Sequence, residues 1–150
     1  MMNMDSKMIE EIIKRVIAEQ MKDRGSEFKK TIDEKSGVAV VKTETVNPEK
    51  FDTGKEGDQV YLKDVFTLEE SPRIGCGIME MHESVFDWTL KYDEMDYIIE
   101  GTLEIIIGDR KIIGEKGDII FIPKNTSIKF SSPNFSRFMY VVYPANWDQL

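Results

Sequence analysis

Three carboxylates lie within four residues of one another near the middle of the sequence. Asp93, Glu94 and Asp96 directly follow Lys91 and Tyr92. Side chains two residues apart in a β-strand point to the same face, so Glu94 and Asp96 share a face if this segment is extended. Two carboxylates, completed by water and phosphate oxygens, are ligands that Mg²⁺ accepts. The pattern therefore makes Glu94 and Asp96 catalytic candidates that hold at most Mg²⁺, an ion that can support phosphoryl transfer.

A substrate pocket is expected beside this cluster. Lys124 and Lys91 are candidates to place a cation against phosphate, and Trp88, Tyr92 and Tyr97 are candidates for the pocket walls. A second interpretation stays open, because an acidic hairpin tip is often only a solvated turn. A buried carboxylate pair can also be part of a structural network, and large apolar side chains fill the interior of small barrels.

Other sites for cofactors are not indicated. Residues 52–57 contain a Gly-Lys pair but neither the spacing nor the following Ser/Thr of a P-loop. The sequence has one histidine, His82, and one cysteine, Cys76, and a transition-metal site needs several such ligands. We therefore expect no tightly bound cofactor, with Mg²⁺ and ATP taking part only if phosphoryl transfer holds.

An amphipathic helix is predicted at residues 1–23. Its isoleucines and a valine recur at helical spacing on one stripe, with charged residues between them: Ile9, Ile12, Ile13, Val16 and Ile17. A helix of this length is marginal alone in water and needs a partner surface. The partner is a groove in another protein, the chain's own second domain, or a dimer mate. A polar linker is predicted at residues 24–37.

The pattern of residues 38–150 predicts an all-β barrel. Ten short β segments alternate with turn signals, at 38–43, 59–63, 74–81, 86–92, 96–100, 102–107, 110–114, 118–122, 127–130 and 136–143. This density of strands without a second helical pattern is typical of an antiparallel barrel or sandwich. The isoleucine run at 105–107 indicates a strand that is buried on both faces or lies at a subunit interface, and a homodimer is expected. Trp147 is expected to close one barrel end as an apolar lid.

Composition excludes several classes of function. The chain has 150 residues and a net charge of −8, and the whole excess lies in residues 37–150 because residues 1–36 balance to zero. An acidic domain repels phosphate backbones, so we expect no nucleic-acid partner. Apolar runs of four or five residues predict no membrane span, and the helix lacks the basic face of a membrane-surface helix. One cysteine and no visible secretion signal indicate a cytoplasmic protein.

Two spacings resemble the paired motifs of the cupin superfamily. Glu94 is followed by Gly101 after six residues, and Gly117 is followed by Pro123 after five. The resemblance implies a single cupin (jelly-roll) barrel with an internal cavity that Glu94 faces and a small-molecule ligand can occupy. It also shows a departure, because the family's metal-binding histidines correspond to apolar positions here: Trp88, Leu90 and Ile128.

A closer resemblance is to the cupin domain of the EutQ family. It covers about residues 38–150 and rests on the segments FDWTLKYDEMDYIIEGTLEIII, KGDIIFIPKNTSIKFSS and RFMYVVYPANW. The resemblance implies an ethanolamine-utilisation protein associated with a bacterial microcompartment, and transfer of phosphate between ATP and acetate. The alternative is a non-enzymatic scaffold with a degenerate pocket. In that case the helix at residues 1–23 is expected to dock onto shell proteins.

Overall fold

The computed structural model describes residues 6–25 and 28–150, with side chains for residues 6–15 and 28–150. The chain forms two compact units, Met1–Asn47 and Pro48–Leu150. The first holds helix α1 (Ser6–Gly25), strands β1 (Lys30–Ile32) and β2 (Ala39–Val41), and a 3₁₀ turn η1 (Thr43–Thr45). Within the described residues, no helix has both the length and the apolar character that a membrane crossing requires.

Helix α1 confirms the predicted N-terminal helix. It ends at Gly25, and its apolar side chains are exposed where they are described, with exposed fractions of 41–55% for Met8, Ile9, Ile12 and Ile13. The side chains of Val16 and Ile17 lie outside the described residues. The described part of the stripe is therefore open to a partner.

A small hairpin lies where the sequence predicts a polar linker and the first barrel strand. β1 and β2 pair antiparallel, with Thr31 opposite Val40. The Asp33 carboxylate accepts hydrogen bonds from the backbone N–H and the hydroxyl of Ser36, at 2.9 and 2.5 Å, and this closes the turn. Strands of three residues are too short to show a periodicity, so turn chemistry was the available signal.

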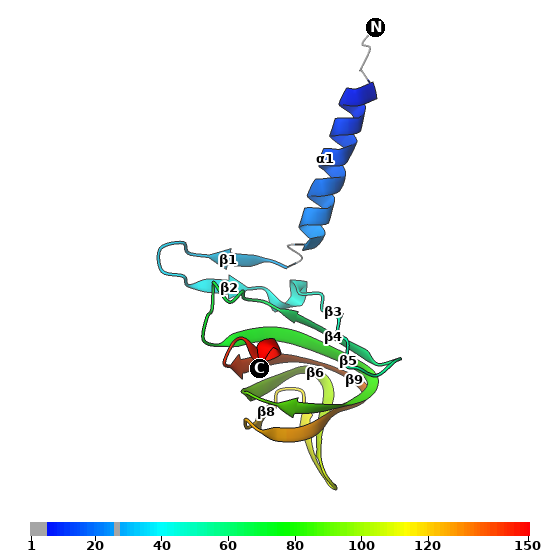
Figure 1. Ribbon diagram of the computed structural model, residues 1–150, viewed down its shortest axis with the longest axis vertical. Helices are drawn as coiled ribbons and strands as arrows, with labels where there is room; N and C mark the ends of the chain where they lie inside the picture. The colour runs from blue at the N-terminus through cyan, green and yellow to red at the C-terminus, as the bar shows by residue number, and fades with distance from the viewer. Residues whose placement is uncertain (1–5, 26–27) are drawn as a thin grey trace. The chain divides into compact units, whose positions relative to one another are not determined.

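The second unit is the predicted all-β cupin barrel. Its elements are β3 (Glu49–Lys50), β4 (Gln59–Asp64), β5 (Gly75–Leu90), β6 (Asp93–Ile107), β7 (Arg110–Glu115), β8 (Ile119–Ile122), β9 (Thr126–Tyr143) and the 3₁₀ turn η2 (Trp147–Gln149). The strands pair in the order β3-β4-β5-β9-β6-β7, and β8 pairs with β6 (Figure 1). Every pairing is antiparallel, as expected for a jelly roll.

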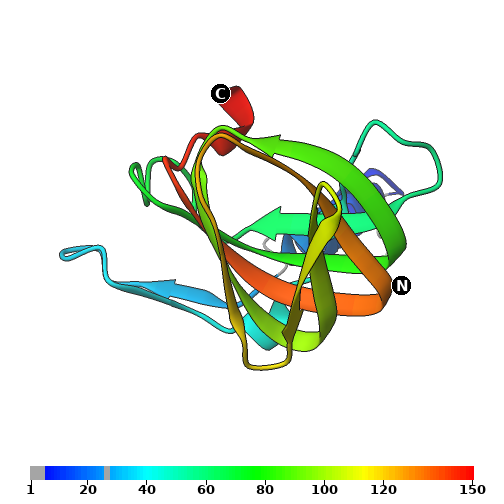
Figure 2. The ribbon, with the colours of Figure 1, turned by 90° about the horizontal axis from the view of Figure 1, so that it is seen from below.

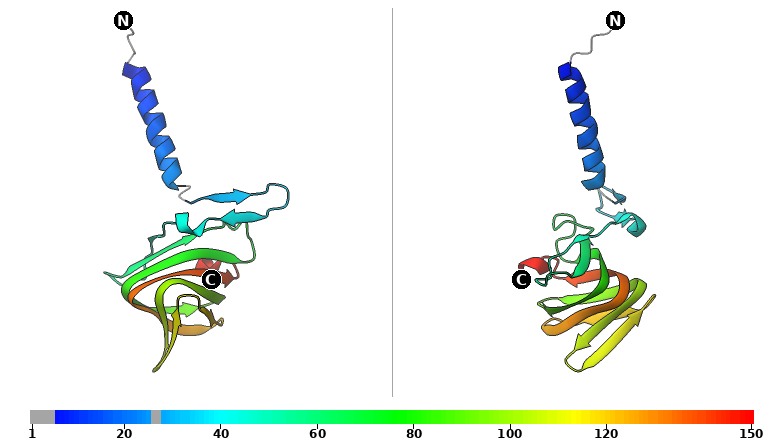
Figure 3. Two further views of the ribbon diagram at one scale, coloured as in Figure 1. Left: turned by 180° about the vertical axis from the view of Figure 1, so that it is seen from behind. Right: turned by 90° about the vertical axis from the view of Figure 1, so that its right-hand side faces the viewer.

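Three long, bent strands build most of this barrel. β5, β6 and β9 each span two of the predicted short segments, and they curve around a common interior (Figures 2 and 3). The predicted breaks are bends inside these strands. In β5 the register shifts between His82 and Ser84, where Glu83 has a positive φ of 44°. A bend or bulge lets one long strand continue from one side of the barrel to the other and pair with different neighbours along its length. Two short separate strands would not provide this continuity.

Large apolar side chains fill the barrel interior. They come from all the long strands, and the Phe86 and Phe130 rings stack at 5.3 Å between centroids. Val60, Met81, Leu90, Ile98, Leu103 and Phe138 are fully buried. Burial of this apolar surface is the main stabilising term for the barrel.

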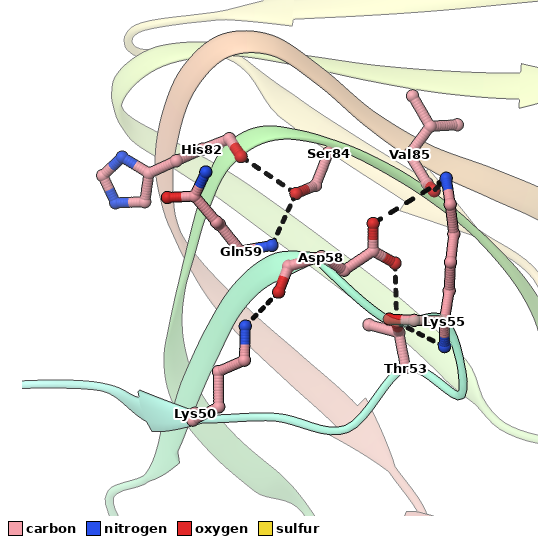
Figure 4. A network of polar contacts seen from close by, with 8 residues as sticks. All are labelled: Lys50, Thr53, Lys55, Asp58, Gln59, His82, Ser84 and Val85. Carbon is pink, nitrogen blue, oxygen red and sulfur yellow. Dashed lines mark hydrogen bonds and ion pairs between the residues drawn. The ribbon is translucent and has the colours of Figure 1, made fainter.

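A polar network fastens the loop before β4 to the bend in β5 (Figure 4). The buried Asp58 carboxylate accepts a hydrogen bond from the Thr53 hydroxyl at 2.6 Å and lies 3.8 Å from Lys55 Nζ. Lys55 Nζ also donates to the Val85 carbonyl at 3.2 Å. The Gly-Lys segment that failed the P-loop pattern therefore has a structural use, with Lys55 balancing a buried carboxylate.

A substitution at Gly101, inside β6, tests how much the bent backbone contributes to the stability of the barrel. Its φ is +76°, and a Cβ atom there would lie 2.0 Å from the Phe135 carbonyl oxygen. We expect Gly101→Ala to lower the free energy of unfolding by about 3 kcal/mol or more, through left-handed strain plus this clash. Gly108→Ala is the matched control, because Gly108 has a φ of +63° and open space around it, and it should cost about 1 kcal/mol. Urea denaturation measures both, and equal losses would contradict the prediction.

Candidate functional site

Glu94 and Asp96 lie on the inner face of β6. Glu94 pairs with Ile122 of β8 and Val142 of β9, and Asp96 lies two residues further along the strand. Both are buried, with exposed fractions of 5% for Glu94 and 0% for Asp96. The strand alternation therefore places two carboxyl groups side by side in an otherwise apolar interior.

Burial changes the protonation of this pair. Glu94 Oε2 and both carboxylate oxygens of Asp96 have no hydrogen-bond partner among the described residues. Burial raises the pKa of Glu94 to about 7. Burial first, and then the neighbouring Glu94 charge, raise the pKa of Asp96 well above its usual range. Two buried, neighbouring carboxyl groups repel each other when both are ionised, so the pair holds at least one proton at neutral pH.

A small cavity lies against Glu94. Its volume is about 20 Å³, which is room for a single water-sized group. The Trp88 indole N–H donates to the Tyr92 hydroxyl at 2.7 Å, so these two wall groups already bond to each other. The walls are otherwise mostly aromatic and aliphatic: Phe51, Leu62, Met79, Phe86, Trp88, Tyr92, Phe130, Tyr140, Val142 and Trp147.

Trp147 of η2 covers the cavity on its outer side. Its ring centroid lies 6.0 Å from that of Tyr92 and 6.4 Å from that of Trp88. The Asp64 carboxylate accepts hydrogen bonds from the side chains of Trp147 and Tyr140. Burial raises the pKa of Asp64, and the two hydrogen bonds oppose this effect. Trp147 therefore lies at this end of the barrel, held by ring contacts and one carboxylate, and its closing of the barrel end stays a prediction.

Outside Trp147 the barrel mouth opens into a hollow of about 710 Å³. We call it the outer hollow. It shares part of the cavity wall and adds three acidic side chains and one lysine: Phe51, Leu62, Asp64, Asp87, Trp88, Thr89, Lys91, Tyr92, Trp147, Asp148 and Leu150. The outer hollow is thus acidic, with Lys91 as its cation.

Two predicted substrate-binding residues lie outside the cavity and the outer hollow as these are lined by described residues. Tyr97 is 43% exposed on the outer face of β6, because the inward placement of Asp96 turns its neighbour outward. Its predicted place in the pocket wall is therefore corrected. Lys124 is exposed in the β8–β9 loop, where its backbone N–H donates to Asp93 Oδ1 at 2.8 Å. Of the two predicted cations, Lys91 lies at the site.

Several site residues were missed by sequence reasoning. Phe51, Asp64 and Tyr140 come from strands or loops far from residues 88–96 in the chain. The hydrogen bond between Tyr140 and Asp64 joins residues 76 positions apart. No local spacing encodes such a contact, so tertiary structure was needed to find it.

The site does not fit a resident metal ion. At the histidine positions of the cupin motifs, Leu90 and Ile128 are buried core residues without ligand atoms. In the described part of the chain, no three His, Cys, Asp or Glu side chains gather as a metal site would require. Glu94 and Asp96 do not fit Mg²⁺ either. The cavity is too small for the ion with its water and phosphate ligands.

Comparison with known proteins identifies the family. The family described as "Ethanolamine utilisation protein EutQ" matches residues 4–149. The chain belongs to the EutQ family. It is 49% identical, over 97% of its length and 95% of the relative's, to a protein of Clostridioides difficile named acetate kinase EutQ. A relative of the same name in Salmonella typhimurium is 39% identical over 77% of the chain, which spans about half (50%) of that relative's length.

Solved structures agree with this assignment to the EutQ family. The structure of the Clostridium difficile EutQ protein matches with a TM-score of 0.78 and 54% identity, over 81% of this chain and 90% of that one. The polyketide cyclase RemF from Streptomyces resistomycificus matches with a TM-score of 0.58 at 18% identity, over 69% of this chain and 78% of that one. RemF therefore shares the fold alone.

The buried pair of this EutQ-family chain should make stability depend on pH. A carboxyl whose pKa is raised in the folded state stabilises the fold below its unfolded pKa, and this contribution is lost as pH rises through the folded pKa. For Glu94 that window runs from 4.5 to about 7, a loss on the order of 3 kcal/mol. Glu94→Gln should remove this loss, so the variant gains stability relative to the parent as pH rises.

Chemical denaturation at several pH values between 4 and 8 measures this difference. Glu115→Gln, an exposed position on β7, is the control. A Glu94→Gln effect that stays constant with pH would contradict the raised pKa.

Proposed function

We propose that this EutQ-family chain transfers a phosphoryl group between ATP and acetate during ethanolamine utilisation. The observation that carries the proposal is the near full-length similarity to the C. difficile protein named acetate kinase EutQ, at 49% identity over 97% of the chain. The Salmonella and Escherichia coli relatives of that name are about twice as long as the matched region, with 50% and 52% covered. The proposal therefore concerns the shared region.

The reaction depends more on cations that compensate the negative charge of the phosphates than on a general base. An oxygen of the acetate carboxylate attacks the γ-phosphorus of ATP, the bond to the bridging oxygen breaks, and ADP leaves with acetyl phosphate as the other product. The attacking oxygen is already anionic at neutral pH, so no proton has to be removed. Positioning and cations near the phosphate supply most of the catalysis in such reactions. Mg²⁺ enters with ATP as part of the substrate.

We place the reactants in the outer hollow. Its volume admits a nucleotide's phosphates, whereas the cavity below does not. Lys91 supplies a cation there, and Trp88 and Tyr92 supply apolar wall. Lys124, near the same end through its bond to Asp93, remains a candidate for the distal part of the nucleotide.

In this proposal, Glu94 and Asp96 can act on the reactants only if Trp147 moves. Trp147 and Tyr92 line both the outer hollow and the cavity that Glu94 lines. If Trp147 moves aside, Glu94 becomes the polar group on the floor of a joint site. With a pKa near 7, it can then donate or accept a hydrogen bond to a reactant at neutral pH.

Activity of Glu94→Gln tests this proposal. We expect ATP consumption with acetate and Mg²⁺ to fall at least tenfold in the variant, because Gln keeps the size of Glu but its neutral amide makes a weaker hydrogen bond to a reactant than a carboxyl group does. Coupled measurement of ADP formation gives the rates, with Glu115→Gln prepared identically as the control. Equal turnover in both variants and the parent would remove Glu94 from the catalysis. Absence of turnover in the parent would favour the second candidate function.

The second candidate function is a scaffold that docks microcompartment shell or cargo proteins. The observation that favours it is the exposed apolar stripe on α1, which includes Ile9, Ile12 and Ile13. Amphipathic helices commonly bind by laying such a stripe into an apolar groove. In this proposal the chain works in the cytoplasm, attached to a microcompartment, and the barrel pocket has no catalytic role.

Substitutions on α1 test the docking. The double variant Ile9→Ser with Ile13→Ser removes apolar contacts on the stripe, and we expect co-sedimentation with shell protein to fall at least tenfold. Glu10→Ser with Lys14→Ser is the matched control, since it has the same i,i+4 spacing on exposed positions of the same helix. Deleting residues 1–23 should abolish binding completely. Unchanged co-sedimentation after the deletion would refute a docking role for the helix.

The predicted homodimer remains a proposal with a suitable surface. The outer face of β6 and β8 exposes Met95, Tyr97, Ile119 and Phe121, and the register places Met95 opposite Phe121 and Tyr97 opposite Ile119. These four side chains form a contiguous apolar patch on one sheet. A second copy of the barrel is the occupant we propose for it.

A further inference from the structure

We propose that the cavity beneath Trp147 binds the head group of a short primary amine in its ammonium form, with the Glu94 carboxylate as its charged partner. The site differs from the outer hollow in which we place ATP and acetate. The inference goes beyond phosphoryl transfer and does not depend on it.

The size of the cavity selects a small head group. Its 20 Å³ hold about one water-sized group, and an –NH₃⁺ group is of that size. A carboxylate or a trimethylammonium group is larger. Glu94 lines this space and is buried, and its Oε2 has no hydrogen-bond partner within the described residues. A charged donor placed there would satisfy the oxygen with a short, strong hydrogen bond.

The aromatic walls favour a cation. Trp88 lies 5.7 Å from Phe51 and 6.2 Å from Phe86 between ring centroids, and Trp147 closes the outer side. The faces of aromatic rings attract ammonium groups, and the attraction increases when water is excluded. Ring faces and a carboxylate pair both repel an anion, so the same walls disfavour acetate in this cavity.

The approach to the cavity is also acidic. Asp64, Asp87 and Asp148 line the outer hollow against the single cation Lys91 among the described lining residues. A cleft of one sign of charge raises the local concentration of ligands of the opposite sign. The cavity and the outer hollow share Phe51, Leu62, Trp88, Tyr92 and Trp147. A short chain attached to the head group can therefore extend between these side chains into the outer hollow.

An ammonium ion also balances the charge of the buried pair. The titratable groups that face Glu94 are Asp96 on β6, Tyr140 on β9 and Tyr92 in the turn before β6, with Asp64 bonded to Tyr140. Burial raises the pKa of both tyrosines, so they stay neutral and supply no positive charge. A bound ammonium favours the deprotonated form of Glu94. Amine affinity should therefore rise as pH rises from 6 to 8, whereas a carboxylate ligand would show the opposite trend.

Tryptophan fluorescence of the whole chain, without ATP, is the test. The sequence has two tryptophans, Trp88 and Trp147, and both line the cavity. Ethanolamine and propylamine are titrated as primary ammonium probes, with ethylene glycol as the neutral analogue, choline as the bulky quaternary ion and acetate as the anion. We expect saturable binding of both amines, at least tenfold tighter at pH 8 than at pH 6. Choline, ethylene glycol and acetate should bind at least tenfold more weakly.

Variants and a second readout complete the test. Glu94→Gln should weaken amine binding at least tenfold, and Glu115→Gln should leave it unchanged. The indole N–H signals of Trp88 and Trp147 in NMR spectra of the parent chain should both shift on adding ethanolamine, which needs no variant to fold. Ethylene glycol binding as tightly as ethanolamine, acetate binding in place of the amines, or a Glu94→Gln affinity equal to the parent's would each overturn the inference. Absence of kinase activity would leave it intact, because the assay contains no nucleotide.

Discussion

Two carboxyl groups buried side by side on β6 are the constraint on which the site depends. Removing an unpaired carboxylate from water is costly, so such a group keeps a proton, finds a partner, or both. Here Glu94 and Asp96 keep a proton between them, and Glu94 also lines the cavity. The raised pKa values follow from this burial.

The barrel around Glu94 and Asp96 forms the two parts of the site, the cavity and the outer hollow. The bent strands β5, β6 and β9 bring aromatic side chains from distant segments to one end, and Trp147 divides the space there. Beneath it lies a small, nearly filled cavity with one carboxyl group. Outside it lies a broad, acidic and accessible hollow with Lys91. This end of the barrel therefore offers two spaces of very different size.

The residues at the positions of the cupin metal ligands belong to the core and to the wall of this site. Leu90 and Ile128 extend the apolar core where the motifs of other cupins carry histidines, and Trp88 becomes part of the aromatic wall. The interior has exchanged a metal and its ligands for packed side chains around a protonated acid pair.

The sequence by itself determined the class of fold, because strand alternation, turn residues and the helical stripe are local patterns. It also placed Glu94 and Asp96 on one strand face and named Trp88, Tyr92 and Lys91, which lie close together in the chain. Tertiary structure decided that paired segments merge into the bent β5, β6 and β9, that Tyr97 points outward, and that Asp64 meets Tyr140 and Trp147. These features depend on long-range pairing and on how completely side chains fill the barrel, and neither is encoded by spacing along the chain.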